Sequence, residues 1–364
     1  YTTATTGPMA PAAASQHQAT TVAPTSGRKV VDEVSGWLRV MDDGSIDRTW
    51  TGPPQALPLM QPVQPYAVPR DGHTLHDLPG EPNLRVYLPE VDAGSVGRLP
   101  VIVHLHGGGF CISHPSWVLY HHFYARLACA VPAVVVTAEL PLAPEQRLPA
   151  QIYTGVDVLR RLRSIAMSDE GSLDDPAAEL LREAADISRV FLVGDSSGGN
   201  LVHLVAARVG EDGADAWAPL RVAGGIPIHP GFVRATRSKS ELQPTPDSVF
   251  FTLDMLDKFL AMALPKGATK DHPYTCPMGP NAPPLESVPL PPMLVAVAEK
   301  DLIRDTNLEY CDALRAAGKE VEVLINRGMS HSFYLNKFAV DMDPTTGERA
   351  QELIDAIKSF VARH

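Results

Sequence analysis

Short apolar runs recur along the chain and alternate with longer stretches in which apolar residues return every three or four positions. The short runs are rich in Val, Ile and Leu, which is typical of strands buried on both faces. They predict strands at residues 84–87, 101–105, 133–137, 190–193, 222–226, 293–298 and 321–325. The longer stretches predict helices at residues 123–130, 152–165, 200–209 and 307–317. This alternation predicts an α/β fold with a mostly parallel central sheet flanked by helices on both faces.

Several segments lie outside the alternation. Residues 30–38 predict a short helix, residues 42–45 a hairpin turn and residues 53–69 a proline-rich crossing. Residues 1–27 are rich in Thr, Ala, Ser and Pro, which is typical of a disordered or tag-like tail. Residues 252–264 predict an amphipathic helix inserted between core strands, either a packed surface helix or part of a cap.

The sequence Gly-Asp-Ser-Ser-Gly at residues 194–198 stands between a predicted strand and a predicted helix. Flanking glycines permit a sharp turn because larger side chains would collide there, and the turn lifts the hydroxyl of Ser196 above the sheet edge. The following helix directs its free amides and its positive dipole end to the same place. A plain tight turn is the alternative interpretation. The order strand, turn and helix favours a nucleophilic serine.

A second motif, His-Gly-Gly-Gly at residues 106–109, directly follows the predicted strand at 101–105. Consecutive glycines expose backbone amides, and such loops supply oxyanion-hole donors in lipases and esterases together with the amide after the nucleophile, here Ser197. A flexible glycine turn is the alternative. The occurrence of both motifs, each after an apolar strand, favours the catalytic interpretation.

A serine nucleophile requires a histidine base and a carboxylate that orients the base, in the chain order Ser, acid, His. Asp301 follows the strand predicted at 293–298, and His331 comes 30 residues later, after one predicted helix and one predicted strand. Glu299 and Asp305 compete with Asp301 for the role of the acid.

The other histidines are expected to serve different purposes. His104 lies within a predicted strand and is expected in the core, and His229 follows a strand and could line a pocket. His121 and His122 are expected on the surface.

Taken together, these segments resemble the plant carboxylesterases of the hormone-sensitive-lipase group, which includes the gibberellin receptors, within the α/β-hydrolases. The resemblance covers about residues 31–364, and shorter matches at 142–145, 148–150 and 256–259 support it. Its most specific motifs are His-Gly-Gly-Gly-Phe at 106–110, Gly-Asp-Ser-Ser-Gly-Gly-Asn at 194–200, Glu-Lys-Asp-Leu-Ile-Arg-Asp at 299–305 and Gly-Met-Ser-His-Ser-Phe-Tyr at 328–334.

The resemblance implies an α/β-hydrolase fold with a helical cap from about residues 30–65 and 235–270. It implies Ser196 as nucleophile, Asp301 as orienting acid and His331 as base. The oxyanion donors would be the amides of Gly108, Gly109 and Ser197. The segments 30–38 and 252–264 would line an apolar substrate pocket, together with Phe110, Trp117, His229, Phe259 and Phe333.

Two departures from the family pattern stand out. Ala-Glu-Leu-Pro at 138–141 replaces the usual residues before Leu-Ala-Pro-Glu, which puts a local loop contact in doubt. Ser197 replaces the usual alanine, and the change should be mild because this residue would act through its backbone amide.

The resemblance implies a carboxylesterase that hydrolyses small apolar esters through an acyl-enzyme, with a plant hormone ester or a xenobiotic ester as the natural substrate class. Two alternatives remain open. Gibberellin receptors resemble the same family and bind a hormone without turnover, although they have lost the triad histidine. Related dehydratases and tuliposide-converting enzymes use the same site for elimination or acyl transfer.

Composition limits the partners. The 364 residues carry a formal net charge of −11, which opposes attraction to nucleic acid and to anionic membranes. The four cysteines are widely spaced, which predicts reduced thiols in a cytoplasmic protein. No metal or organic cofactor is implied, and no secretory signal or membrane-spanning run is recognised. Because the motifs must converge on one sheet, we expect one domain over residues 28–364, as a monomer or a homodimer.

Overall fold

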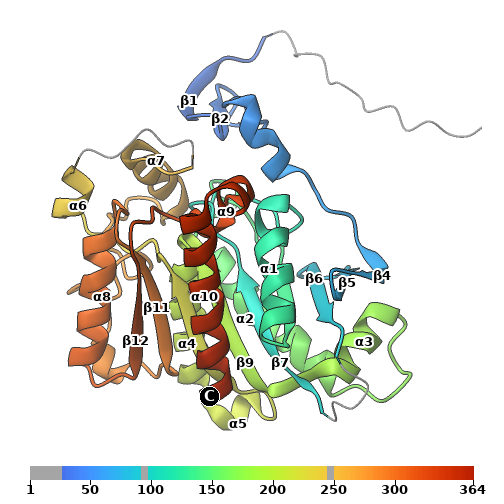
Figure 1. Cartoon of the computed structure of the whole chain (residues 1–364). Coiled ribbons are helices and arrows are strands. Elements are labelled where there is room, and N and C mark those ends of the chain that lie inside the picture. Colours follow the sequence, from blue (N-terminus) through green and yellow to red (C-terminus); the bar gives the residue numbers. More distant parts are fainter. Residues whose placement is uncertain (1–26, 92–96, 244–249) are drawn as a thin grey trace, which may run out of the picture.

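A nine-stranded sheet forms the centre of the structure, a computed structural model that describes residues 27–91, 97–243 and 250–364 (Figure 1). In spatial order the strands are β12 (Val321–Asn326), β11 (Met293–Ala298), β10 (Val222–Ile228), β9 (Ala185–Asp195), β7 (Leu99–Leu105), β8 (Val134–Ala138), β6 (Leu84–Pro89), β5 (His73–Leu78) and β4 (Tyr66–Arg70). Neighbours from β12 to β8 are parallel, and β6, β5 and β4 add an antiparallel edge. The predicted mostly parallel sheet is confirmed.

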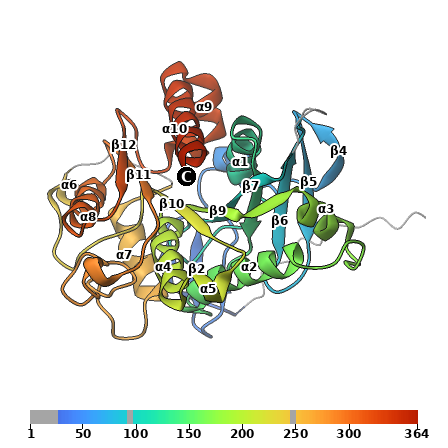
Figure 2. The same ribbon diagram turned by 90° about the horizontal axis from the view of Figure 1, so that it is seen from below.

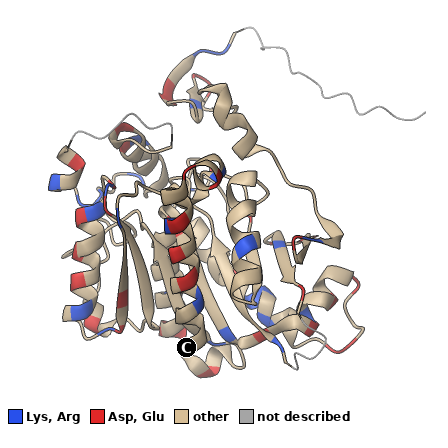
Figure 3. Ribbon diagram, in the orientation of Figure 1, with Lys and Arg blue, Asp and Glu red and all other residues tan. Residues whose placement is uncertain are grey.

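Helices cover both faces of this sheet (Figure 2). One face packs against α1 (Val118–Ala130) and α10 (Pro344–Arg363). The other packs against α2 (Ala150–Ala166), α3 (Pro176–Ala184), α4 (Ser197–Asp212) and α8 (Arg304–Ala316), with the short α5 (Ala214–Trp217) after α4. In Figure 3 the helices α8 and α10 carry many charged residues, whereas the strands between them carry few.

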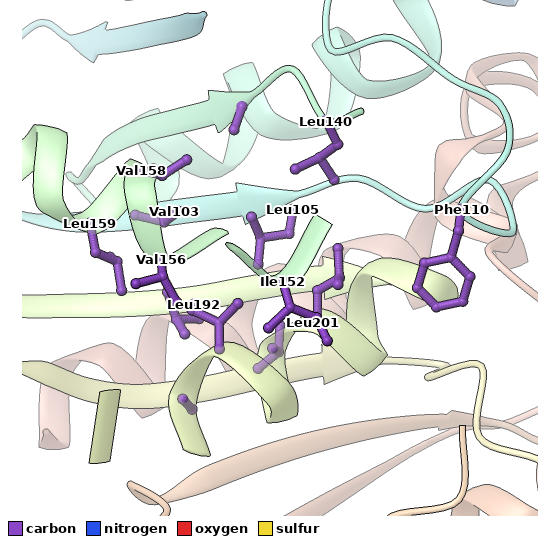
Figure 4. Close-up of a cluster of buried hydrophobic side chains, with 14 of the residues drawn as sticks. Val103, Leu105, Phe110, Leu140, Ile152, Val156, Val158, Leu159, Leu192 and Leu201 are labelled. Atoms are coloured by element: carbon purple, nitrogen blue, oxygen red, sulfur yellow. The ribbon is translucent and has the colours of Figure 1, made fainter. Parts of the chain in front are cut away.

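Successive residues of the central strands point to opposite faces, as the two-residue period of a strand requires. On β7, Val101 and Val103 enter one apolar cluster, whereas Ile102 enters the other. Figure 4 shows the first cluster, in which Leu105 and Leu192 meet side chains from α2 and α4. A sheet buried on both faces explains why these strands appear in the sequence as continuous apolar runs.

The N-terminal region differs from its prediction. In place of a helix at 30–38, β1 (Val30–Val34) pairs antiparallel with β2 (Leu38–Met41), which pairs with β3 (Ile46–Asp47). The spacing of apolar residues suited a helix, but β-branched valines favour an extended chain and Gly36, with φ of 75°, reverses it. The predicted turn at 42–45 is present, closed by the Met41 amide donating to the Ser45 carbonyl at 2.9 Å.

The N-terminal sheet lies above the carboxyl ends of the central strands, beside α7 (Leu253–Ala263) (Figure 1). The Lys258 ammonium donates to the Glu33 carbonyl at 2.7 Å and so joins α7 to β1. The proline-rich crossing forms η1 (Pro54–Met60), and α6 (Lys239–Leu242) precedes α7. The short elements η2 (Leu285–Ser287), η3 (Phe333–Leu335) and α9 (Lys337–Met342) complete the described chain. The predicted tail, except Gly27, lies outside the described residues.

The two histidines of α1 are less exposed than predicted. His122 is buried, and its Nε2 lies 3.0 Å from the Leu335 carbonyl. His121 is half-buried and packs against the rings of Tyr66 and Tyr87. The reason is that α1 is covered on its outer sides by η1, η3 and α10.

The four cysteines, Cys111, Cys129, Cys276 and Cys311, are free thiols. Among the described residues, none of the helices combines the length and apolarity that a bilayer crossing requires.

Candidate active site

The predicted catalytic residues come from four loops at the carboxyl edge of the parallel strands, where ligand sites of open α/β sheets form. Ser196 follows β9, Asp301 follows β11, His331 follows β12 and the glycine loop follows β7. Ser196, His331 and the glycines border one cavity of about 280 Å³. The four loops, spread along the chain from residue 106 to residue 331, therefore lie at one edge of the sheet.

Ser196 occupies a sharp turn between β9 and α4. Its φ of 52° and ψ of −122° lie in a backbone region that residues other than glycine rarely adopt. The glycines make this turn possible, because a Cβ on Gly198 would lie 1.9 Å from the Leu105 carbonyl and one on Gly194 2.3 Å from the Gly198 carbonyl. The geometry matches the predicted nucleophile elbow, with α4 beginning at Ser197.

His331 is oriented by Asp301. The Nδ1–H of His331 donates to Asp301 Oδ2 at 2.6 Å, and Asp301 Oδ1 accepts from the Ile303 amide at 3.1 Å. Both side chains are largely buried. With the proton on Nδ1, Nε2 carries a lone pair, and this buried atom has no hydrogen-bond partner among the described residues. The imidazole is therefore prepared to accept a proton.

The two competing carboxylates are engaged elsewhere. Glu299 accepts from the Gly328 amide at 2.7 Å and is about half exposed. Asp305 accepts from the Ser240 amide at 2.9 Å and pairs with Arg304. Of the three acids, Asp301 is the one whose carboxylate contacts His331.

The glycine loop is tied to the elbow by two hydrogen bonds. The Phe110 amide donates to Ser197 Oγ at 3.1 Å, and the Gly107 amide donates to Asp195 Oδ1 at 3.2 Å. The side chain of Ser197 thus has a contact that an alanine could not make, in addition to the expected role of its amide. The amides of Gly108 and Gly109 have no acceptor among the described residues.

Asp195 belongs to a buried polar chain beneath the elbow. His104 Nε2 lies 3.3 Å from Asp195 Oδ1, and His104 Nδ1 lies 2.9 Å from Thr137 Oγ1. Burial lowers the pKa of His104. The predicted core position of His104 is correct, and its imidazole links β8 to the residue that precedes the nucleophile.

His229 supports the loop of His331 and does not line the cavity, in contrast to the expectation. It is fully buried, and its Nδ1 accepts from the Ser332 amide at 3.0 Å. The proton must then be on Nε2, which donates to Asn326 Oδ1 at 2.9 Å. Burial lowers the pKa of His229 to about 4.

The ligand atoms of His229, Asp301 and His331 lie within 4.8 Å of one another. Both nitrogens of His229 are already hydrogen-bonded, which disfavours a metal at this cluster.

Aromatic side chains form much of the cavity wall. Of the predicted pocket residues, Phe110, Phe259 and Phe333 border it. Trp117 does not border it; its ring stacks on that of the wall residue Trp37, with a centroid separation of 6.4 Å.

The segment predicted at 30–38 contributes Trp37 to the wall, whereas the aromatic residues Phe250 and Phe251 are among the wall residues that were not predicted. The Phe251 ring stacks on the His331 imidazole, with centroids 4.0 Å apart and an angle of 26° between the planes. The adjacent Phe250 and Phe251, directly before the predicted inserted helix, were the available signal. The lining contains neither Lys nor Arg among the described residues.

Comparison with known proteins places this fold in a family. A profile described as the alpha/beta hydrolase fold matches residues 102–335. The chain belongs to the α/β-hydrolase family. It is 36% identical over 314 residues to "Probable carboxylesterase 6" of Arabidopsis thaliana, covering 84% of this chain and 85% of that protein. Gibberellin receptor GID1C of the same plant is 36% identical over 250 residues, 67% of each chain.

A solved structure supports the same assignment. The Pyrobaculum calidifontis esterase superposes with a TM-score of 0.62 at 26% identity, covering 80% of this chain and 86% of that one. The predicted fold and the predicted resemblance to plant carboxylesterases and gibberellin receptors are both confirmed.

Proposed function

We propose that this protein is a serine carboxylesterase with Ser196 as nucleophile, His331 as general base and Asp301 as orienting acid. The observation that carries the proposal is the 2.6 Å contact from His331 Nδ1 to Asp301, which leaves Nε2 free at the same cavity edge as the strained Ser196 turn. Carboxylesterase relatives at 36% and 32% identity support the reaction class.

Hydrolysis proceeds in two steps. His331 Nε2 takes the Ser196 proton as Oγ attacks the ester carbonyl, and Asp301 stabilises the imidazolium that forms. The amides of Gly108, Gly109 and Ser197 donate to the oxyanion. The imidazolium then protonates the leaving alcohol, and an acyl-enzyme remains. In the second step His331 takes a proton from water, the hydroxide attacks the acyl carbon, and the carboxylic acid leaves as Ser196 regains its proton.

The proposed substrates are small, uncharged, apolar esters. Aromatic rings dominate the wall, and a carboxylate on the substrate would find no Lys or Arg among the described lining residues. Burying an unpaired charge is unfavourable, so neutral esters fit this cavity best. Plant hormone esters and xenobiotic esters both belong to this class. The chemistry requires no metal or organic cofactor.

We also propose that residues 28–364 act as one domain in which the segments 30–65 and 235–270 cap the site. Trp37 from the first segment and Leu256, Phe259 and Leu260 from the second border the cavity. The Lys258 contact to Glu33 joins the two segments to each other.

Ligand binding without turnover is the second candidate, since gibberellin receptors are among the relatives. The relative named 2-hydroxyisoflavanone dehydratase, 29% identical over 349 residues, keeps elimination open as well. The hydrogen-bonded Asp301–His331 pair favours hydrolysis over simple binding, because a receptor needs no oriented base.

The test is hydrolysis of p-nitrophenyl esters from acetate to octanoate by the wild type, Ser196→Ala and His331→Ala. We expect turnover in the wild type and a loss of about a thousandfold or more in kcat in both variants, with unchanged folding. Absence of turnover in the wild type, with binding of a hydrophobic hormone that survives both substitutions, would favour the receptor alternative.

A further inference from the structure

The loop after β7 that carries Gly108 and Gly109, called the oxyanion loop below, is held by hydrogen bonds from other elements. The Phe110 carbonyl accepts from the Ala143 amide at 2.9 Å and from Gln151 Nε2 at 3.0 Å. The next carbonyl, that of Cys111, accepts from Arg48 Nε at 2.7 Å. Two consecutive carbonyls are thus held by other elements, and one of the donors, Arg48, directly follows the N-terminal sheet.

Arg48 is itself held firmly. Its Nη1 and Nη2 donate to the two carboxylate oxygens of Glu145 at 2.7 and 2.6 Å, and Nη2 also donates to the Ala143 carbonyl at 2.9 Å. The hydrogen bond from Arg48 lowers the pKa of Glu145, so this carboxyl stays ionised. A two-pronged guanidinium–carboxylate pair fixes orientation as well as distance. One side chain therefore connects the oxyanion loop with the loop at residues 142–145, whose local contacts the sequence left in doubt.

The position of Arg48 in the chain means that this contact connects the N-terminal sheet to the oxyanion loop. Arg48 directly follows β3, in the sheet that also supplies Trp37 to the cavity wall. The side chain is about three-quarters buried, with 26% of its surface exposed, whereas Glu145 is 49% exposed. A movement of the N-terminal sheet would therefore pull on the Cys111 carbonyl, three residues from Gly108.

We propose that Arg48 is a positioning residue for the oxyanion hole, which acts through the Cys111 carbonyl and couples the N-terminal sheet to catalysis. The inference rests on the proposed esterase function. Small displacements of oxyanion donors reduce the rate because the donors must meet charge that develops in the transition state. Loss of Arg48 should consequently lower kcat more than it raises KM.

The test compares Arg48→Met, Arg48→Lys and Glu145→Gln with Arg39→Met as the matched control. Arg39 pairs with Asp47 at 2.6 Å inside the same N-terminal sheet, and no hydrogen bond joins it to the oxyanion loop in the described residues. Rates for p-nitrophenyl butyrate are normalised to active sites titrated with a fluorophosphonate. Affinity for a trifluoromethyl ketone, whose adduct carries the oxyanion, is measured in parallel.

We expect kcat to fall about tenfold in Arg48→Met, with KM within about twofold of the wild type. The ketone should also bind about tenfold more weakly, because a loss of transition-state stabilisation lowers the rate and the affinity for the transition-state analogue by the same factor. Arg48→Lys and Glu145→Gln should lie between this variant and the wild type, and Arg39→Met should match the wild type. A further variant, Arg48→Ala, should regain part of its lost kcat when guanidinium is added.

Three results overturn the proposal: an unchanged kcat per titrated site in Arg48→Met, an equal loss in Arg39→Met, or a kcat loss without weaker ketone binding. If Arg48→Met fails to fold, Glu145→Gln decides, and an unchanged kcat in that variant also overturns the proposal. A wild type that neither hydrolyses esters nor reacts with the fluorophosphonate would instead refute the esterase function itself.

Discussion

Acidification should destabilise this protein well above the pH at which its carboxylates titrate, because several of its histidines are buried in neutral form. Burial lowers the pKa of His106, His203 and His229 to about 4, from an ordinary value of 6.5. The folded state then binds fewer protons than the unfolded state. The stability is complete above about pH 6.5 and is lost as the pH falls from 6.5 towards 4.

The size of the effect follows from these values. At pH 5 each such histidine removes about 2 kcal/mol of unfolding free energy relative to pH 8, so three remove about 6 kcal/mol. This is a large part of the roughly 5–15 kcal/mol typical of domain stability.

Urea unfolding followed by circular dichroism at pH 8, 6.5 and 5 measures this loss directly. The variant His203→Phe provides the internal control. It loses the 2.9 Å contact between His203 Nδ1 and the Tyr310 hydroxyl at every pH. Its unfolding free energy should nevertheless fall less steeply with decreasing pH, because unfolding takes up one proton fewer. A free energy of unfolding that stays within about 1 kcal/mol between pH 8 and pH 5 would refute the reasoning.

Two further predictions concern the site. Asp301→Asn should lower kcat about a thousandfold to ten-thousandfold with little loss of stability, because an amide no longer fixes the proton on His331 Nδ1; activity per titrated site checks this, and a loss below tenfold would contradict it. Phe259→Ala should change the ranking of ester substrates by kcat/KM, since Phe259 borders the cavity, whereas Trp117→Ala should leave the ranking intact because Trp117 is not among the residues that border it. A changed ranking in Trp117→Ala alone would reverse that assignment.

The sheet could be predicted from the sequence because a strand buried on both faces must be apolar at every position. The run at 293–298 coincides with β11, and the pattern also located α7 to within one residue. The candidate site could be predicted because the proposed chemistry requires particular residues in a particular order. Glycine at 194 and 198 is compulsory where backbone atoms of neighbouring loops would meet a Cβ.

The N-terminal sheet and the pocket wall could not be predicted in the same way. Val30, Val31, Val34, Trp37 and Leu38 have helical spacing, yet the turn at Gly36 folds them into a hairpin that is stabilised by contact with a helix more than two hundred residues away. Contacts between segments so far apart produce no periodic pattern of apolar residues from which they could be predicted. The same is true of Arg48, whose partners lie at 111, 143 and 145.

His229 and Trp117 show a second limit. Both were expected to line the pocket, but His229 instead accepts a hydrogen bond from the amide next to His331, and Trp117 caps α1 outside the cavity lining. Whether a side chain faces the cavity or lies behind its wall depends on packing by other elements. Sequence spacing alone does not determine that choice.

The central claim is that Ser196 is a nucleophile activated by His331, and covalent trapping tests it most directly. The protein is incubated with a p-nitrophenyl phosphonate, the released p-nitrophenol is counted, and the modified peptide is identified by mass spectrometry. We predict one p-nitrophenol per chain, a phosphonyl group on Ser196, no adduct in Ser196→Ala and a strongly slowed reaction in His331→Ala. Ester turnover that persists in Ser196→Ala, or an adduct on another residue, would contradict the account.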